Sequence, residues 1–139
     1  MLNRNRKLSI VALVFCIVIL LSAIALAQDF KVKLGLYERL VVMGLLPQTG
    51  NFATLKIVTE LNLMLGPTDE EYKAAGLEPQ ESGGVIAKNW LAVPEKEFTF
   101  KEIALGMIVD ALKKLDEEKK LTMEHFRVYE KFILTKKEE

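Results

Sequence analysis

Cysteine is nearly absent from this sequence, and the single one is Cys16. Cys16 follows Val14 and Phe15 in the middle of an apolar run, whereas a lipoprotein signal has a small residue just before its cysteine near the end of such a run. We therefore expect Cys16 to be an ordinary small apolar residue and not a site of lipid attachment. Beyond residue 27 the chain contains no cysteine, which excludes disulfide bonds within the part that follows.

Histidine is equally scarce, since His125 is the only one. Common protein sites for transition metals take several histidine or cysteine ligands, and one imidazole without a thiol cannot supply them. A calcium loop of the Asp-x-Asp-x-Asp-Gly type is also missing. The glycine pair Gly83-Gly84 has no following Lys-Ser or Lys-Thr and does not form a phosphate-binding loop. The sequence predicts neither a metal nor a cofactor.

Candidate nucleophiles are few, because Ser82 is the only serine after residue 27. Its surroundings, Glu81-Ser82-Gly83-Gly84, lack the Gly-x-Ser-x-Gly elbow that exposes a catalytic serine. Ser82 and His125 are thus weak catalytic candidates. A non-enzymatic role is the main prediction, and the alternative is a small extracytoplasmic hydrolase in which His125 acts with Ser82 or with carboxylates.

An excess of positive charge is missing as well. The whole chain has 19 basic and 19 acidic residues. Because three of the basic residues precede residue 8, residues 28–139 carry 16 basic against 19 acidic side chains. Binding to nucleic acid or to anionic lipid through a cationic face is therefore not expected.

The most prominent feature that is present is the uncharged apolar run Leu8–Ala27. Twenty helical residues reach about 30 Å, the thickness of the hydrocarbon core of a bilayer. Arg4, Arg6 and Lys7 precede the run and are expected to keep the N-terminus in the cytoplasm, so that residues 28–139 lie outside it.

Two interpretations of this run remain open. The sequence Ala25-Leu26-Ala27 fits a signal-peptide cleavage site, with small side chains at Ala25 and Ala27, and cleavage there would release a secreted or periplasmic protein beginning at Gln28. The length of the run exceeds the roughly 7–15 residues of a usual signal-peptide core and favours a retained transmembrane anchor. In that case the membrane is a partner through residues 8–27.

Residues 28–139 are long enough for one domain. Their pattern predicts a mainly α fold, a small bundle of about five helices with a short β-hairpin packed on it. We expect helices over residues 34–46, 52–65, 69–75, 100–119 and 123–134. The hairpin is expected over residues 85–90 and 97–99, with Trp90 and Phe98 in contact with the helices.

Capping signals mark several of these helix ends. Thr68 and Glu71 are spaced as a capping box, and Asn51 and Thr122 are expected at N-caps. Glycines at positions 66 and 76 are expected to end helices. The acidic cluster after Thr68 could suggest a metal site, but capping already explains these carboxylates.

The expected inward face of the long helix after Phe100 consists of apolar residues at alternating spacings of three and one, namely Phe100, Ile103, Ala104, Met107, Ile108, Ala111, Leu112 and Leu115. On the last helix Phe126, Tyr129 and Ile133 are expected to point inward, with Leu121 packing on Phe126.

The first two helices contain more apolar residues than one buried face requires; these are Val41, Val42, Leu45, Leu46, Leu61, Leu63, Met64 and Leu65. Either the domain buries all of them, or an apolar patch remains for a protein partner, a second copy or the membrane surface. We therefore expect an extracytoplasmic interaction or binding domain, exported or tethered to the membrane. A binder of a small apolar ligand between the helices and the hairpin is a further hypothesis.

Overall fold

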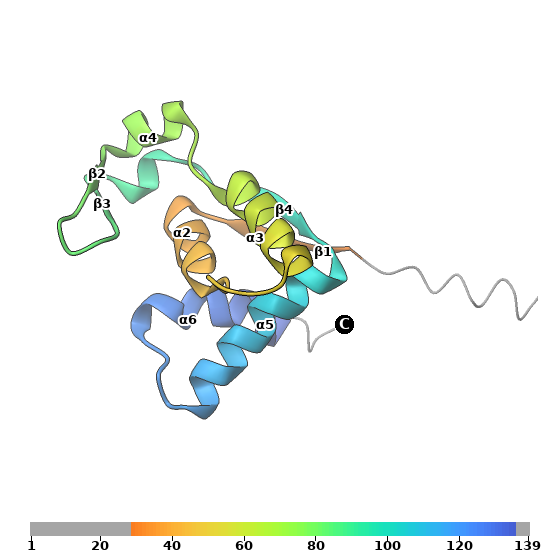
Figure 1. Ribbon diagram of the computed structural model, residues 1–139. Coiled ribbons are helices and arrows are strands. Elements are labelled where there is room, and N and C mark those ends of the chain that lie inside the picture. Colours follow the sequence, from red (N-terminus) through yellow and green to blue (C-terminus); the bar gives the residue numbers. More distant parts are fainter. Residues whose placement is uncertain (1–28, 136–139) are drawn as a thin grey trace, which may run out of the picture.

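The computed structural model describes residues 29–135 and shows a mostly helical fold, as the sequence predicts. Within these residues there are five α-helices and two small antiparallel sheets (Figure 1). The elements are β1 Phe30–Leu34, α2 Leu36–Leu45, α3 Phe52–Leu65, α4 Asp69–Ala75, β2 Leu77–Pro79, β3 Val85–Ala87, β4 Lys96–Phe100, α5 Glu102–Glu117 and α6 Met123–Tyr129. A 3₁₀ turn, Trp90–Ala92, precedes β4, and a π-helical turn, Glu130–Leu134, continues α6.

The predicted leader lies outside the described residues. This applies to the apolar run Leu8–Ala27, to Cys16 and to the expected cleavage site at Ala25 and Ala27. Between residues 29 and 135, no helix combines the length and the apolar character needed to span a bilayer.

The predicted β-hairpin has the wrong partners. Residues 85–87 pair with β2, with Leu77 opposite Ala87, whereas β4 pairs with β1, with Phe30 opposite Phe100. The alternation of apolar residues does predict β4 as a strand, but its partner lies 66 residues earlier in the chain for the pair Val32 and Phe98. Local sequence signals cannot reveal such a distant pairing, and they favour the nearest β-prone segment as the partner of β4.

The sheet formed by β1 and β4 carries the main core on one face. Phe98 and Phe100 from β4 are buried, and the ring of Phe100 lies edge-on to Phe132, with 5.4 Å between centroids. A second, smaller core lies under the β2–β3 hairpin and the 3₁₀ turn, where Trp90 packs partly buried against its residues. The buried members of this small core are Leu36, Ala75, Leu77 and Val93.

The inward face of α5 follows the prediction in its centre and departs from it at its start. Ile108 and Leu112 are fully buried, and Ala104 is buried with them. Leu105 is also buried, whereas Ile103 is 65% exposed and does not belong to the core. The prediction failed at Ile103 because α5 leaves the sheet directly after Phe100 and turns this residue toward α3 instead of toward the interior.

The last helix buries only part of the predicted set. Ile133 is buried and Tyr129 packs partly buried against the core, as predicted, whereas Phe126 is 55% exposed. Val128 and Phe132 are fully buried and were not predicted to point inward. A regular α-helix repeats its buried face every three or four residues, but the chain switches to π-helical geometry at Glu130. The change in periodicity brings Phe132 and Ile133 into the core together, and it could not be read from the sequence.

Thr68 forms both bonds of the capping box expected at the start of α4. Its hydroxyl accepts from the backbone N–H of Glu71 at 3.2 Å, and its own N–H donates to Glu71 Oε2 at 3.0 Å. Asn51 caps α3 in a similar way, accepting from the N–H of Thr54 at 2.9 Å. At the other end of α4, Gly76 adopts a left-handed conformation with φ of 60°.

We expect Thr68→Ala to lower the free energy of unfolding by about 0.5–2 kcal/mol, because it removes the side-chain acceptor for an otherwise free helical N–H. Chemical denaturation followed by circular dichroism measures this loss. The matched control is Thr59→Ala, at an exposed threonine in the middle of α3 whose hydroxyl donates to the carbonyl oxygen of Leu55 and caps no helix end. A loss at position 68 no larger than that of the control would contradict the capping role.

Candidate functional site

Two helices close their N-termini with a glutamate that is also buried. Glu71 does so at α4 as described above, and Glu38 does so at α2, where its Oε2 accepts from the N–H of Gly35 at 2.9 Å. Both glutamates are less than 8% exposed. A buried carboxylate requires compensation beyond one backbone hydrogen bond, and ion pairs supply it here.

The partners of Glu71 are two cations. Nη2 of Arg39, itself 2% exposed, lies 3.0 Å from Glu71 Oε2, and Lys96 at the start of β4 pairs with the other carboxylate oxygen. Burial alone would raise the pKa of Glu71, but the ammonium of Lys96, the N-cap N–H and the guanidinium of Arg39 together lower this pKa from 4.5 to about 2. Arg39 also lies over the ring of Phe98, 5.7 Å from its centroid.

Glu38 pairs with Lys131 from the π-helical turn. Lys131 Nζ lies 2.7 Å from Glu38 Oε2, 3.1 Å from Glu95 Oε1 and 2.7 Å from the carbonyl oxygen of Lys33. The ammonium of Lys131 therefore links the π-helical turn to three other segments, which are α2, the end of β1 and the loop before β4. We call Glu38, Arg39, Glu71, Lys96 and Lys131 the buried ion cluster.

The buried ion cluster is a structural feature and not a reactive site. Its carboxylates form short ion pairs with its cations. The side chains of Glu38, Arg39 and Glu71 are buried, so a substrate has no access to them. Sequence reasoning missed it. The available signal was the pair Glu38-Arg39 in the middle of the apolar pattern of α2, where no solvated charge would be expected.

His125 occupies a capping position. Its Nδ1 accepts from the N–H of Thr122 at 3.1 Å and lies 3.0 Å from the Thr122 hydroxyl oxygen. As an acceptor, Nδ1 carries no proton in this arrangement. Thr122 is the N-cap residue of α6, so this bond gives the only histidine a role in closing a helix end.

Ser82 lies in the exposed turn between β2 and β3. In the described part of the chain neither hydrogen bond of His125 involves Ser82, and the serine hydroxyl has no hydrogen-bonded base. The structure therefore does not bring Ser82 and His125 together as nucleophile and base. Within residues 29–135 there is also no group of three or more histidine, cysteine or acidic side chains placed to hold a metal ion.

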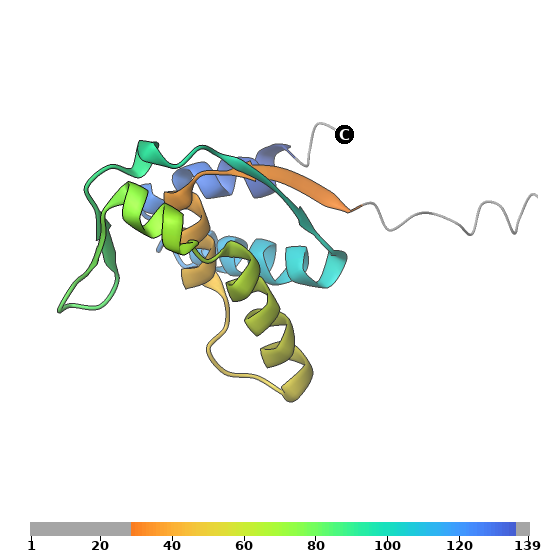
Figure 2. The ribbon, with the colours of Figure 1, turned by 90° about the horizontal axis from the view of Figure 1, so that it is seen from above.

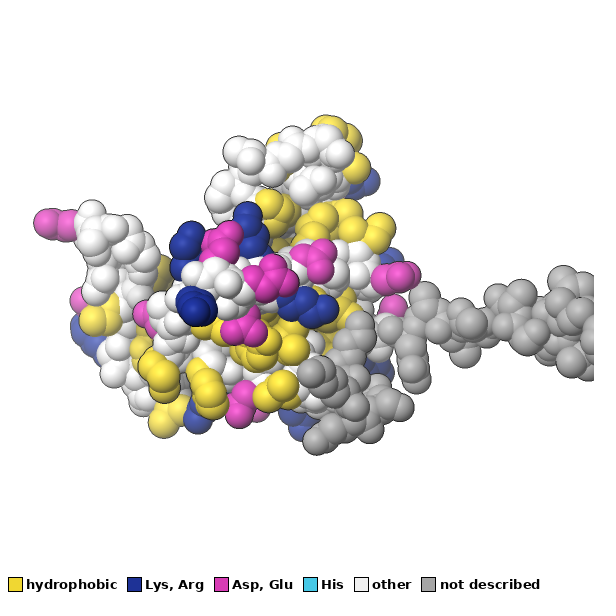
Figure 3. All heavy atoms as spheres, turned by 90° about the horizontal axis from the view of Figure 1, so that it is seen from below, with side chains coloured by type: hydrophobic (Ala, Val, Ile, Leu, Met, Phe, Trp, Pro, Cys, Tyr) yellow, Lys and Arg dark blue, Asp and Glu magenta, His cyan; other side chains and the backbone are white. Residues whose placement is uncertain are grey.

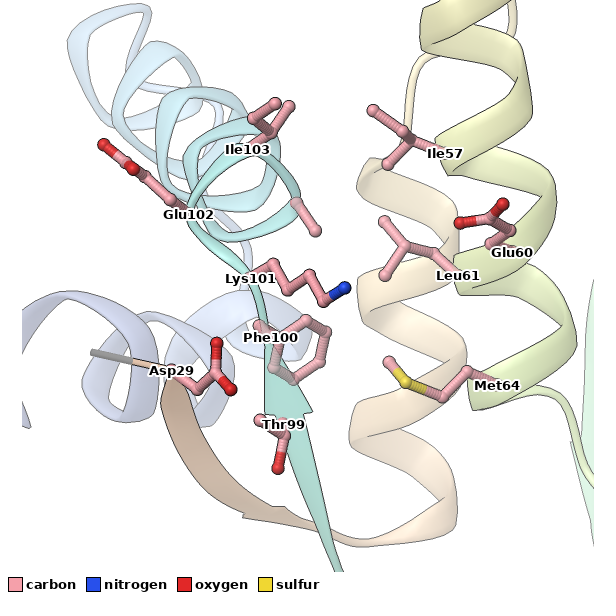
Figure 4. Close-up of a pocket in the computed structure, with 11 residues that line it drawn as sticks. Asp29, Ile57, Glu60, Leu61, Met64, Thr99, Phe100, Lys101, Glu102 and Ile103 are labelled. Carbon is pink, nitrogen blue, oxygen red and sulfur yellow. The ribbon is translucent and has the colours of Figure 1, made fainter. Parts of the chain in front are cut away.

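The face of α3 that turns toward α5 lines a groove of about 480 Å³ (Figure 4). Ile57 on α3 and Ile103 on α5 point toward one another across it, and Phe100 lies at its base. On α3 the lining residues Ile57, Glu60, Leu61 and Met64 follow the spacing i, i+3, i+4 and i+7, which is one continuous helical face. Only Leu61 among them is fully withdrawn into the core.

Charged side chains surround the apolar part of this groove. Lys101 extends toward α3 between the two helices, with Glu60 on the α3 side and Asp29 beside the start of β1 (Figure 4). Glu102 lines the groove at the first turn of α5. In Figure 4 the carboxylate of Glu102 points away from α3, so Asp29 and Glu60 are the carboxylates on the same side as Lys101. The groove is therefore apolar with a rim that carries more negative than positive charge.

The groove is open because α3 is packed on one side only. Figure 2 shows α3 standing away from the rest of the domain, with its first turns farthest from the other elements. Its buried residues are Val58, Leu61 and Leu65. The predicted surplus of apolar residues is thus not fully buried, since Leu63 is 81% and Phe52 is 86% exposed.

A wider and shallower depression of about 700 Å³ lies on another side of the domain, between α2, the β2–β3 hairpin and the start of α6. Tyr37 and Trp90 meet edge-to-face there, with 5.1 Å between centroids, and Glu124 and His125 lie at its rim. Burial, followed by the charge and hydrogen bonding of Glu124, raises the pKa of Tyr37 above 10.0. The contact between Tyr37 and Trp90 holds the small core against α2, so packing accounts for the aromatic residues that line this depression.

Comparison of the chain with protein families, with curated proteins and with solved structures finds no significant match. The groove between α3 and α5, with its apolar floor and charged rim, is the feature on which the proposal below rests.

Proposed function

We propose that this protein is a non-enzymatic interaction domain that acts outside the cytoplasm and binds a protein partner in the groove between α3 and α5. The observation that carries the proposal is the apolar surface that Ile57 and Met64 of α3 form with Ile103 of α5 above the buried Leu61, a surface that residues 29–135 leave partly uncovered. Apolar side chains at this spacing form a surface into which another helix can pack.

The proposed location rests on the leader in the sequence. The apolar run ends at Ala27, and Asp29, which lines the groove, is only two residues further on. Two extended residues span at most about 7 Å. If the run is retained as an anchor, the groove opens close to the membrane surface, where a membrane-bound partner can reach it. If it is cleaved after Ala27, the same domain is released.

The surface charge also favours a protein partner over nucleic acid. Figure 3 shows one face of the domain, on which lysine and arginine side chains alternate with aspartate and glutamate and form no extended positive field. Residues 28–139 as a whole carry more acidic than basic side chains. A polyanion would find no continuous cationic surface on this face.

Site-specific photocrosslinking in the native cells tests the proposed interaction. A photoreactive amino acid replaces either Ile103 in the groove or Leu63, an exposed residue of α3 that does not line the groove, each in the full-length chain. We expect a discrete protein adduct from position 103 and none from position 63. Equal crosslinking at both positions, or none at either, would contradict an interaction in the groove.

The location has a separate test. Protease added outside intact cells or spheroplasts is expected to digest residues 28–139. The intact mass of the purified protein distinguishes a chain that starts at Gln28 from one that starts at Met1. Full-length protein recovered folded from the cytosol, with residues 1–27 still attached, would contradict the extracytoplasmic location.

A further inference from the structure

We infer that the partner segment is an amphipathic helix with basic residues beside its apolar face. This inference rests on the proposed function and adds the chemistry of the partner. Its evidence is the combination, in one groove, of a helical apolar stripe and a rim in which carboxylates outnumber cations.

The apolar part of the groove sets the shape of the occupant. From Ile57 to Met64 the lining face of α3 is two helical turns long, about 10 Å at 1.5 Å per residue. Ile103 on α5 provides the facing wall, and Phe100 provides the base. An occupant that covers the accessible parts of Ile57, Met64 and Ile103 together needs apolar side chains that recur every three or four residues, which a helix presents on one face.

The rim sets the charge of the occupant. Glu60 comes from the lining face of α3, Asp29 precedes β1 and Glu102 begins α5, while Lys101 is the only cation that lines the groove. None of these four side chains forms an ion pair within residues 29–135. Lysine or arginine residues on the flanks of a bound helix can pair with the carboxylates of Asp29 and Glu60, whereas acidic flanks would be repelled by them.

The same rim argues against two other occupants. A second copy that docked symmetrically through this groove would bring together two rims that each carry more carboxylates than cations. An anionic lipid surface would face a net negative rim and gain little from Lys101. The small apolar ligand that the sequence also suggests would contact the apolar floor of the groove but would form no ion pairs with the charged side chains of its rim.

The test uses the full-length protein in a neutral detergent and two labelled helical peptides of about 15 residues, long enough for the spacing of the groove. Both peptides carry leucine at positions i, i+3, i+4 and i+7, and they differ only in having lysine or glutamate at the flanking positions. Fluorescence anisotropy measures binding at low and at high salt. We expect the lysine peptide to bind at least about tenfold more tightly, with a preference that shrinks as salt rises.

Matched variants place the peptide in the groove. Ile103→Asp is expected to weaken binding of the lysine peptide by at least about tenfold, whereas Leu63→Asp, at an exposed residue that does not line the groove, is expected to change it less than about twofold. Glu60→Gln is expected to reduce the preference for lysine over glutamate, and Glu117→Gln, at the far end of α5, is expected to leave it unchanged.

The outcomes separate the two proposals. Binding of both peptides with equal affinity, lost on Ile103→Asp, would overturn the basic partner and leave the groove as an interaction site. The inference would be overturned if neither peptide binds, or if binding is insensitive to Ile103→Asp. It would also be overturned if the groove binds vesicles that contain anionic lipid and does not bind the peptides. A concentration-dependent dimer that is lost on Ile103→Asp would instead identify a second copy as the occupant.

Discussion

Glu71→Ala is expected to lower the free energy of unfolding by about 3–5 kcal/mol, since removing one partner of a buried ion pair leaves the others uncompensated. The guanidinium of Arg39 would remain 2% exposed without its carboxylate, and α4 would lose its capping box. Urea denaturation followed by circular dichroism measures the loss. For a domain whose total stability is about 5–15 kcal/mol, this is a large fraction.

The adjacent glutamate provides the control. Glu70 lies in the same first turn of α4 but is exposed, so Glu70→Ala is expected to cost less than about 1 kcal/mol.

In a double-mutant cycle, Arg39→Leu combined with Glu71→Leu is expected to be less destabilising than the sum of the two single changes. Additive losses would show that Arg39 and Glu71 do not interact energetically.

The same carboxylate gives the stability a pH dependence. The pKa of Glu71 is about 2 in the folded protein, below its ordinary value of 4.5. A lowered folded-state pKa means that its contribution is fully present above about pH 4.5 and is lost as the pH falls toward 2. We expect this acid-dependent loss to shrink in the Glu71→Ala protein. An unchanged pH profile would contradict a lowered pKa.

Ile108→Asp is expected to unfold the domain, because it places a charge at a fully buried position in the middle of α5. Circular dichroism measures this effect, and we expect the cooperative thermal transition and most of the helical signal to be lost. Ile103→Asp is the matched control, the same substitution on the same helix at a residue that is 65% exposed, and it is expected to retain the transition. Two variants with equal thermal stability would show that the inward face of α5 is assigned wrongly.

The paired variants also mark the limit of the sequence reasoning. Alternating spacings of three and one predicted Ile108 and Leu112 in the core correctly, but the same rule placed Ile103 there as well. The first turn of a helix that leaves a strand takes its direction from the strand, and a periodic pattern does not contain that direction. The groove, which Ile103 lines, could not be predicted for the same reason.

The buried ion cluster shows a related limit. The sequence did indicate that Glu71 caps a helix, since both bonds of the capping box join residues three positions apart. It did not indicate that Arg39 and Lys96 pair with this carboxylate, because they come from segments more than 20 residues away on either side. A local pattern identifies a cap, whereas an ion pair between distant segments depends on how those segments pack.

The sequence by itself determined the helical class of this protein and most of its helix boundaries, because capping residues, glycines and apolar spacing act within one or two turns of chain. Only the tertiary structure decided which strand pairs with β4, which charges are buried with Arg39, and that one face of α3 remains uncovered beside α5. These features join residues that are far apart in the chain, and their free energy comes from packing that no single segment specifies.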